Sequence, residues 1–308
     1  MKKLFLMIFF SLAGLAAIAS ISTSIRQTIA KREIEVEWLA EQTIVPPLAE
    51  TSRLEILPLY EEAHAADAYI SGHGVSYLIR TDSGTVLLDI GNNPDQLEVV
   101  PFVQNLKVLG IDWDEVDRII ISHPHPDHVG GTNAWWDATV SMAGIDLPGS
   151  MDDRFIFAPT PLAFKGAVHI TVPTLPIPDV ATTGVISFPV NFPLSLLEPK
   201  GSEQALVVRV AGQGLVLITS CGHPGLEKLV ERAEALYGQT VIGVVGGLHY
   251  ETATPQEIEP QIQFLQGRRP GLVALSPHDS NPQVLAAFQT AFGDRYHTLR
   301  VGEAIQFP

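Results

Sequence analysis

The residues with the clearest chemistry form one short cluster, His123-Pro124-His125-Pro126-Asp127-His128. A residue before proline is driven towards an extended backbone, so His123 and His125 are expected to be extended. Side chains two positions apart in an extended chain point to the same side, so both imidazoles can face one point, with Asp127 as a third candidate. His128 can then turn to a neighbouring point. Imidazole and carboxylate groups at this spacing predict a metal centre for Zn²⁺, with Fe or Mn as alternatives.

Further histidines follow short apolar runs elsewhere in the chain. Four such runs lead into one each: Ile121-Ser122-His123, Thr219-Ser220-Cys221-Gly222-His223, Gly246-Gly247-Leu248-His249 and Ser276-Pro277-His278. Because strand ends meet at one edge of an α/β sheet, where ligands usually bind, we expect these side chains at a single site. One histidine in such a place is commonly an ordinary surface or core residue. Four together are better explained by a shared function.

The elements that must position these residues alternate short strands with helices, as in a layered α/β fold. The first half predicts a β-hairpin or meander over 75–80 and 85–89, a helix from about 94 to 110, and a strand over 118–122. The second half predicts strands over 214–219, 241–245 and 272–275, each followed by a helix, at 226–236, 255–266 and 283–292. Between the halves, residues from about 142 to 199 are rich in proline and are expected to form loops and edge strands rather than a separate domain.

Composition limits the classes of partner. The chain has 308 residues, of which 46% are hydrophobic, enough for a sizeable core. Its 19 Lys and Arg against 34 Asp and Glu give a net charge of −15, which disfavours nucleic-acid binding through a broad basic face. A small-molecule substrate is the expected partner, and an anionic one is allowed because metal ions can reverse the field inside a cleft.

The first residues carry a targeting signal. Lys2 and Lys3 precede an uncharged stretch over 4–25, and Ala17-Ile18-Ala19 offers a cleavage site. Residues 1–25 are therefore predicted to be a signal peptide or an N-terminal membrane anchor. Residues 26–53 are predicted to be a linker, and 54–308 the folded domain. The protein is expected to be exported, either periplasmic or secreted, or held at the membrane by residues 4–25 if they are not cleaved.

Only one cysteine, Cys221, is present, so no internal disulfide can stabilise an exported fold. The fold must rest on its core and on any metal. Cys221 precedes His223 by two positions and can share its side of the chain. A metal ligand and a small buried residue at a strand end are both consistent with its position.

The cluster at 123–128, followed by Gly130-Gly131, resembles the H-x-H-x-D-H motif of the metallo-β-lactamase superfamily. The upstream run Leu87-Leu88-Asp89-Ile90-Gly91 resembles that family's strand ending in Asp-x-Gly. The resemblance implies an α/β fold, the αββα sandwich of the metallo-β-lactamase fold, and two divalent metal ions. It implies that His123 and His125 bind one metal, that Asp127 and His128 bind the other, and that Asp89 braces the motif loop.

Within the superfamily, the chain is similar to the branch that includes dihydropterin–aminobenzene phosphate synthase. The similar segments are Gly72-His73-Gly74-Val75-Ser76, Thr182-Thr183-Gly184, Ser220-Cys221-Gly222-His223-Pro224-Gly225, Gly246-Gly247-Leu248-His249 and Pro277-His278. The chain also departs from the superfamily: Glu203-Gln204 stands where many members supply a histidine, and Cys221 stands where many place a bridging aspartate.

The remaining site residues are assigned on this resemblance. His223 is the candidate to complete the first metal's ligands, and His278 the second's. His249 is expected near the site as a ligand or a substrate contact, and His73 is expected to line the pocket. Trp135-Trp136, just after the motif, are expected to pack in the interior rather than to form a substrate platform.

These residues favour a metal-dependent hydrolase in which a metal-activated hydroxide attacks an ester, lactone, amide or phosphoester of a small molecule. Asp127 is the expected catalytic residue, which orients the hydroxide. The alternatives are a synthase or transferase of the dihydropterin phosphate branch, an iron oxidoreductase, and a non-catalytic metal-binding protein of the cell envelope. The substrate is not encoded in any motif, because specificity depends on loops.

Overall fold

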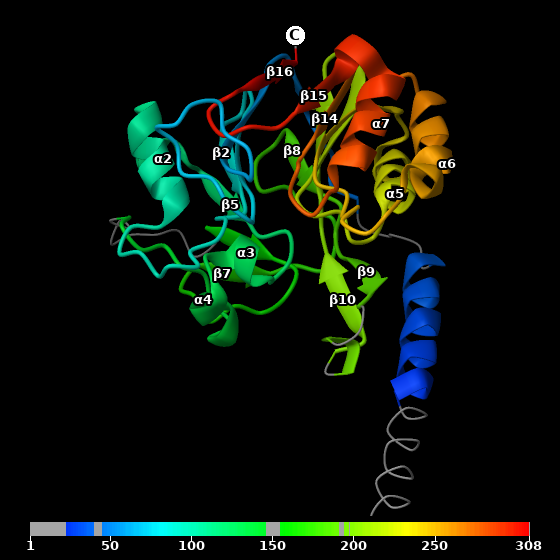
Figure 1. The fold of residues 1–308 in the computed structure, drawn as a ribbon, viewed down its shortest axis with the longest axis horizontal. Coiled ribbons are helices and arrows are strands. Elements are labelled where there is room, and N and C mark those ends of the chain that lie inside the picture. The colour runs from blue at the N-terminus through cyan, green and yellow to red at the C-terminus, as the bar shows by residue number, and fades with distance from the viewer. Residues whose placement is uncertain (1–22, 40–44, 146–154, 191–193, 197, 308) are drawn as a thin grey trace, which may run out of the picture. The chain divides into compact units, whose positions relative to one another are not determined.

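A computed structural model describes residues 23–39, 45–145, 155–190, 194–196, 198 to 307 of the chain (Figure 1). The chain divides into two compact units. One comprises 1–41 and 186–202, and the other comprises 42–185 and 203–308. The second unit carries every histidine discussed above, so its architecture positions the candidate site.

The first sheet of the larger unit begins as a meander and continues with parallel strands. Its order is β16 (Ile305–Phe307), β2 (Leu54–Tyr60), β3 (Ser76–Arg80), β4 (Thr85–Leu88), β5 (Arg118–Ile120), β6 (Ile156–Ala158) and β7 (Ala167–His169). β3 and β4 pair antiparallel, as predicted for the hairpin, and β4 to β7 pair parallel. The connections carry α2 (Pro101–Leu109), α3 (Pro126–Val129) and α4 (Thr132–Trp136).

The second sheet holds the strand-and-helix repeats of the second half. Its order is β1 (Glu50–Thr51), β11 (Leu206–Val210), β12 (Gly214–Thr219), β13 (Val241–Gly246), β14 (Leu272–Leu275) and β15 (Tyr296–Thr298), with β8 (Val180–Thr182) also paired to β11. β12 to β15 run parallel. The helices α5 (Leu226–Tyr237), α6 (Pro255–Gln266) and α7 (Pro282–Phe292) separate them.

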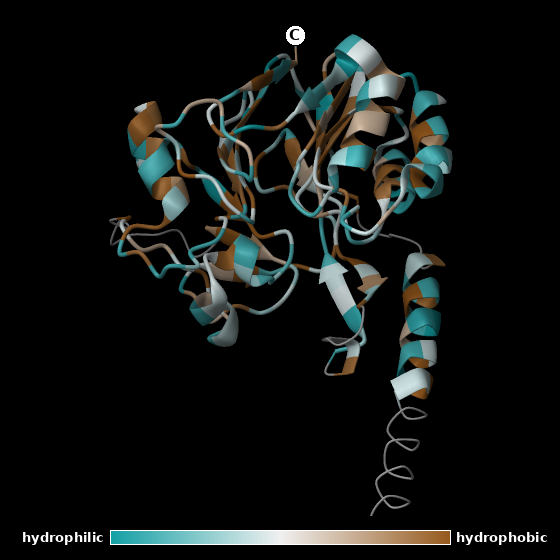
Figure 2. Ribbon diagram, in the orientation of Figure 1, coloured by the Kyte–Doolittle hydropathy of each residue, from teal (hydrophilic) through white to brown (hydrophobic). Residues whose placement is uncertain are grey.

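Alternation along the strands builds two core layers. On β3, Tyr77 and Ile79 belong to a cluster that also contains Val216 and Ile218 of β12, so this cluster joins the two sheets. Leu78, between them, faces the other way into a cluster with residues of α2. Such strands are buried on both faces. In Figure 2 the strands are largely brown, while the helices carry hydrophilic teal residues. The larger unit is therefore the αββα sandwich that the sequence predicts.

The predicted helix from 94 to 110 begins later than expected. α2 starts at Pro101, after an extended Val100, and ends at the left-handed Gly110. Before it, the side-chain amide of Asn93 donates to the Leu97 carbonyl and accepts from the Leu97 amide. This closed turn takes the place of the first helical turns, since asparagine competes with helix by bonding to nearby backbone groups.

The smaller unit corrects the prediction of a linker over 26–53. Residues 23–39 form a helix, and β1 of the larger unit lies near the end of that stretch. The helix packs with a hairpin of β9 (Ile186–Pro189) and β10 (Lys200–Glu203), and its Glu37 carboxylate accepts from the Ser187 hydroxyl and pairs with the Lys200 ammonium. The hairpin also belongs to the smaller unit, so the last part of 142–199 is not part of the main domain as predicted.

Most of the predicted signal peptide or anchor, residues 1–22, lies outside the described residues. Within the described part of the chain, none of the helices combines the length and the apolar run that crossing a bilayer requires.

Candidate metal centre

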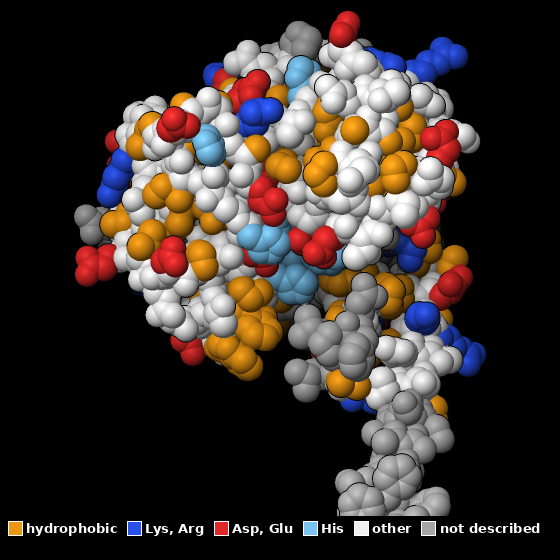
Figure 3. All heavy atoms as spheres, in the orientation of Figure 1, with side chains coloured by type: hydrophobic (Ala, Val, Ile, Leu, Met, Phe, Trp, Pro, Cys, Tyr) orange, Lys and Arg blue, Asp and Glu red, His pale blue; other side chains and the backbone are white. Residues whose placement is uncertain are grey.

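The predicted site residues follow the carboxyl ends of strands in both sheets. Asp89 follows β4 and His123 follows β5 in the first sheet. In the second sheet, the parallel strands β12, β13 and β14 lead into His223, His249 and His278. Figure 3 shows histidine side chains gathered beside acidic side chains on one face. The sandwich therefore brings the histidines at the strand ends of both sheets to one place, as predicted.

The motif loop turns its ligands in two directions. His125 is extended (φ −82°, ψ 153°) and caps α3, which begins at Pro126 with the proline ring at a position where helices tolerate it. Asp127 and His128 lie within this helix. Asp127 is thus not a third member of the extended segment, as considered from sequence. The change from extended to helical backbone separates the directions of His125 and His128.

The first donor group consists of His123, His125 and His223, whose ligand atoms lie within 4.8 Å of one another. Nε2 of His123 is 3.0 Å from Nδ1 of His125. Burial lowers the pKa of His123 well below its usual value, and the His128 and His125 imidazoles lower it further. Burial and the His223 imidazole likewise lower the pKa of His125 to about 4. Both rings are therefore neutral at pH 7 and have a lone pair available for a metal.

The second donor group forms around the Asp127 carboxylate. Oδ2 of Asp127 is 3.1 Å from Nε2 of His278 and 3.3 Å from Nε2 of His128. His128 is fully buried, and apart from this ion-pair contact its Nε2 makes no well-aligned hydrogen bond among the residues described. A buried nitrogen without a hydrogen bond is costly in a folded protein. A metal ion bound at this nitrogen would remove that cost.

Asp89 lies beneath the motif loop, fully buried, in an αL conformation (φ 56°). Its carboxylate accepts from the Ser122 amide (2.7 Å), the Ser122 hydroxyl (2.6 Å) and Nδ1 of His128 (2.7 Å). The Ser220 hydroxyl also donates to it. Asp89 thereby ties the end of β5, the end of β12 and His128 together, and it orients Nε2 of His128 into the site.

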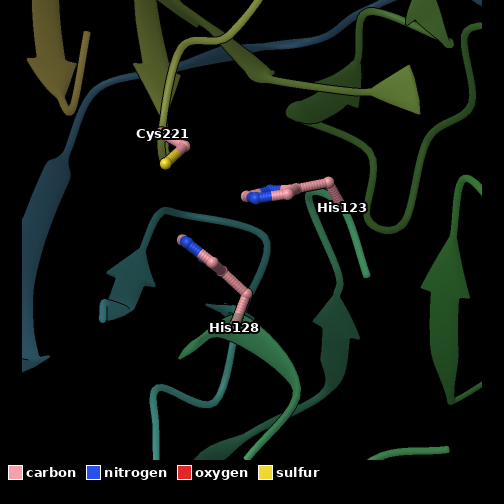
Figure 4. Close-up of side chains that lie close together, drawn as sticks. All are labelled: His123, His128 and Cys221. Carbon is pink, nitrogen blue, oxygen red and sulfur yellow. The ribbon is translucent and has the colours of Figure 1, made fainter. Parts of the chain in front are cut away.

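Cys221 lies between the two groups. It is buried, and its sulfur lies within 4.8 Å of ligand atoms of His123 and His128, and also of His223 and His249. Figure 4 shows the thiol and the imidazoles of His123 and His128 pointing toward one another. Burial alone would raise the pKa of the thiol, but the neighbouring imidazoles of His128, His223 and His278 lower it. The position suits a metal ligand.

The electrostatics of the site favour a cation. Burial alone would lower the pKa of His278, but hydrogen bonds with Asp127 and Cys221 raise it to about 12. Burial alone would likewise lower the pKa of His223, but hydrogen bonds with Cys221 and Glu203 raise it to about 10. The carboxylates and the thiol thus stabilise positive charge in a buried place. Divalent ions would supply that charge to a donor set of imidazoles, carboxylate and thiol, which is one that Zn²⁺ and iron accept.

Three acidic residues at the site were not predicted. Glu203 is fully buried and accepts from Nδ1 of His223. Glu62 pairs with His73 and His278, and Asp279 lies between His278 and His249. The sequence signals for two of these residues were weak. Glu203 stands where many members of the superfamily supply a histidine, and Asp279 directly follows the predicted ligand His278.

His73 and His249 lie at the edge of the centre. Nε2 of His73, a largely exposed residue, is 3.5 Å from Oδ2 of Asp127. The His249 ring lies 4.5 Å from that of His223, and its backbone is αL (φ 52°), a strained state for a histidine. Trp135 packs against the core, but Trp136 is 72% exposed, so the prediction that both tryptophans are packed is wrong for Trp136. Ala134 is the buried residue of the short helix α4, and Trp136 at the end of that helix lies at the surface.

Comparisons with known proteins agree with this geometry. Residues 70–145 match the model of the metallo-beta-lactamase superfamily. The chain is 23% identical over 299 residues to the 7,8-dihydropterin-6-methyl-4-(beta-D-ribofuranosyl)-aminobenzene-5'-phosphate synthase of Methanocaldococcus jannaschii, covering 84% of this chain and 99% of that protein. A solved structure described as Tm1679, a metal-dependent hydrolase of the beta-lactamase superfamily, has a TM-score of 0.57 at 21% identity and covers 82% of this chain and 99% of its own. The structural likeness shows that the fold is shared.

Proposed function

Because the chain belongs to the metallo-β-lactamase superfamily, we propose that it is a metal-dependent hydrolase that cleaves an ester, lactone, amide or phosphoester bond of a small molecule. One observation carries the proposal. Two neighbouring groups of metal-ligand atoms lie at the carboxyl ends of the strands, and the buried Nε2 of His128 points to Asp127 without a well-aligned hydrogen bond among the described residues.

The chain offers ligands for two divalent ions. His123, His125 and His223 would hold the first, and Asp127, His128 and His278 the second, with Cys221 between them. Zn²⁺ is the favoured metal because it accepts imidazole, carboxylate and thiolate together, with Fe or Mn as alternatives. Such ions polarise a carbonyl or phosphoryl oxygen and make water nucleophilic at neutral pH.

The protein's own groups orient this chemistry. Burial alone would raise the pKa of Asp127, but His128 and His278 lower it far below its usual range, so Asp127 is a carboxylate at neutral pH. A carboxylate in this position accepts a hydrogen bond from the attacking water and holds it in line with the substrate. Asp89 and Glu203 fix the orientations of His128 and His223 through hydrogen bonds of 2.7 and 2.8 Å.

A second candidate is a synthase that transfers a group rather than hydrolysing a bond. Its support is the relative from Methanocaldococcus jannaschii, which is named a synthase and is matched over 99% of its length. Both candidates use the same ligands and differ in whether water or a second substrate attacks. A non-catalytic metal-binding protein would instead bind metal and turn over neither kind of substrate.

Metal content and turnover, measured together, test the proposal. The purified chain is analysed for bound metal and for hydrolysis of generic ester, phosphodiester and lactam substrates, alongside His125→Ala. The matched control is His297→Ala, since His297 is exposed on β15. About two metals per chain and turnover that only His125→Ala abolishes would support the hydrolase. Chelation should abolish turnover, and added Zn²⁺ should restore it.

Absence of bound metal after reconstitution would refute the metal centre, and metal binding without any turnover would favour the non-catalytic protein.

We also propose that the protein lies outside the cytoplasm, on the basis of residues 1–25, and that its partner is a small-molecule substrate. Fractionation of cells that express the full chain tests this, because cleavage yields a shortened soluble protein and an uncleaved anchor yields a membrane-bound one.

A further inference from the structure

A carboxylate that was not predicted lies against the second donor group. Cys221 stands at the end of β12, where the superfamily resemblance predicts an aspartate that bridges the metals. Asp279 directly follows His278 after β14, on the neighbouring part of the same sheet edge. Oδ2 of Asp279 is 3.5 Å from Nε2 of His278 and 3.5 Å from the sulfur of Cys221.

The contacts of Asp279 leave most of its hydrogen-bonding capacity unused. Its distances to the nearest nitrogens of His249 (3.7 Å) and His73 (3.8 Å) exceed those of a hydrogen bond. The thiol of Cys221 donates to it, and Nε2 of His278 forms an ion-pair contact with it, both at 3.5 Å. A carboxylate can accept about four hydrogen bonds, and this side chain is only 17% exposed. Three imidazoles and a thiol thus surround Asp279 at 3.5 to 3.8 Å, which is the arrangement of a group of metal-ligand atoms rather than of a network of short hydrogen bonds.

Two carboxylates also converge on one nitrogen. Oδ2 of Asp127 is 3.1 Å from Nε2 of His278, and Oδ2 of Asp279 is 3.5 Å from the same atom. His73, Asp127, His278 and Asp279 together offer ligand atoms within 4.8 Å of one another. Like charges this close repel unless positive charge lies between them, and a metal ion bound by the His278 imidazole would supply that charge as a protonated imidazole does. Nε2 of His128 points to the same carboxylate, 3.3 Å from Oδ2 of Asp127.

We propose that Asp279 is an additional ligand of the second metal and supplies the carboxylate that the chain lacks at position 221. The inference rests on the proposed metal-dependent function and adds a residue to it. With Asp279, the second ion has a mixed set of two carboxylates and two imidazoles, from Asp127, Asp279, His128 and His278. The first ion keeps an all-imidazole set, so the two sites differ in their preference for hard and soft metals.

Stepwise metal titration of the full chain tests the proposal. Wild type, Asp279→Asn and Asp279→Ser are titrated with Co²⁺, followed by visible absorption, and the bound Zn²⁺ is counted after dialysis. Asparagine has the shape of aspartate and tolerates the αL backbone of this residue (φ 49°), so the fold is kept. Asp294→Asn, in the exposed 3-10 helix Gly293–Arg295, controls for the change in charge.

The proposal predicts that both Asp279 variants bind the first ion as wild type does and bind the second at least tenfold more weakly. Asp294→Asn should bind both normally. Two unchanged steps in Asp279→Asn would overturn the ligand assignment while leaving the metal-dependent function intact. Equal weakening of both steps would also overturn it, because the residue would then act on the whole site. A wild-type chain that binds no Co²⁺ or Zn²⁺ would overturn the proposed function and this inference together.

Discussion

Replacement of Glu203 by glutamine should weaken the first metal site without unfolding the protein. Glu203 is fully buried. Its Oε2 accepts from the amide and from Nδ1 of His223, both at 2.8 Å, and its Oε1 accepts from the Gly222 amide at 2.8 Å. One carboxylate thus holds both the backbone and the imidazole of His223. Burial alone would raise its pKa, but the bond with His223 lowers it overall, so Glu203 is ionised at pH 7.

The size of the effect follows from these bonds. Glutamine keeps one accepting oxygen but turns an NH₂ group toward a donor, so at least one of the three short bonds is lost. Loss of a hydrogen-bond partner behind a metal-ligating histidine reduces metal affinity about 10- to 100-fold, or about 1.4 to 2.7 kcal/mol. The expected change in Glu203→Gln lies in this range and concerns the ion bound by His223.

The assay is competition for Zn²⁺ with a chromophoric chelator, with circular dichroism as a check on folding. Glu231→Gln is the matched control, because Glu231 is exposed on α5 and loses the same charge. An affinity of Glu203→Gln within twofold of wild type would refute the reasoning, since the bonds to His223 would then contribute nothing to the orientation of the ligand. An equal loss in Glu231→Gln would assign the effect to net charge.

Three further predictions test the fold around the site. Gly74→Ala should lower metal content and turnover, because its backbone is at φ 126° and a methyl group there would collide with the Asp127 carbonyl. Metal analysis of the folded variant measures this, and a wild-type metal content would contradict it. Leu87→Ala should lower the free energy of unfolding by about 2 to 5 kcal/mol, since Leu87 is fully buried in the layer beneath α2. Urea denaturation measures this, and a change below about 1 kcal/mol would contradict it. Trp136→Ala should change the free energy of unfolding by less than about 0.5 kcal/mol because the side chain is 72% exposed, and a larger loss would show that the ring is covered in solution.

Much of the fold was predictable because its strands and helices have strong local patterns. The strand Gly214–Thr219 and the helix Pro255–Gln266 have the predicted bounds, and Gly110 ends its helix as predicted. The short helix α3 and the late start of α2 were not predicted. α3 is only four residues long, too short for a periodic pattern, and the start of α2 depends on side-chain hydrogen bonds of Asn93.

The sequence by itself determined the kind of chemistry and its approximate place. The histidine and aspartate side chains at 123–128 share few chemical roles besides metal binding. The histidines that follow apolar strands were expected to meet at one edge of a sheet. These arguments depend on residue type and local spacing, which require no knowledge of distant contacts.

Only the tertiary structure decided which acidic residues join the site. Glu203 approaches His223 from 20 positions away in the sequence, and Glu62 reaches His278 across the two sheets. Asp279 is adjacent to His278, yet its contact with Cys221 spans 58 positions. A lone acidic residue has no periodicity, so nothing local separates a buried carboxylate beside a histidine from an exposed one. Packing of the two sheets against each other makes that choice, because it sets which loop ends are buried together.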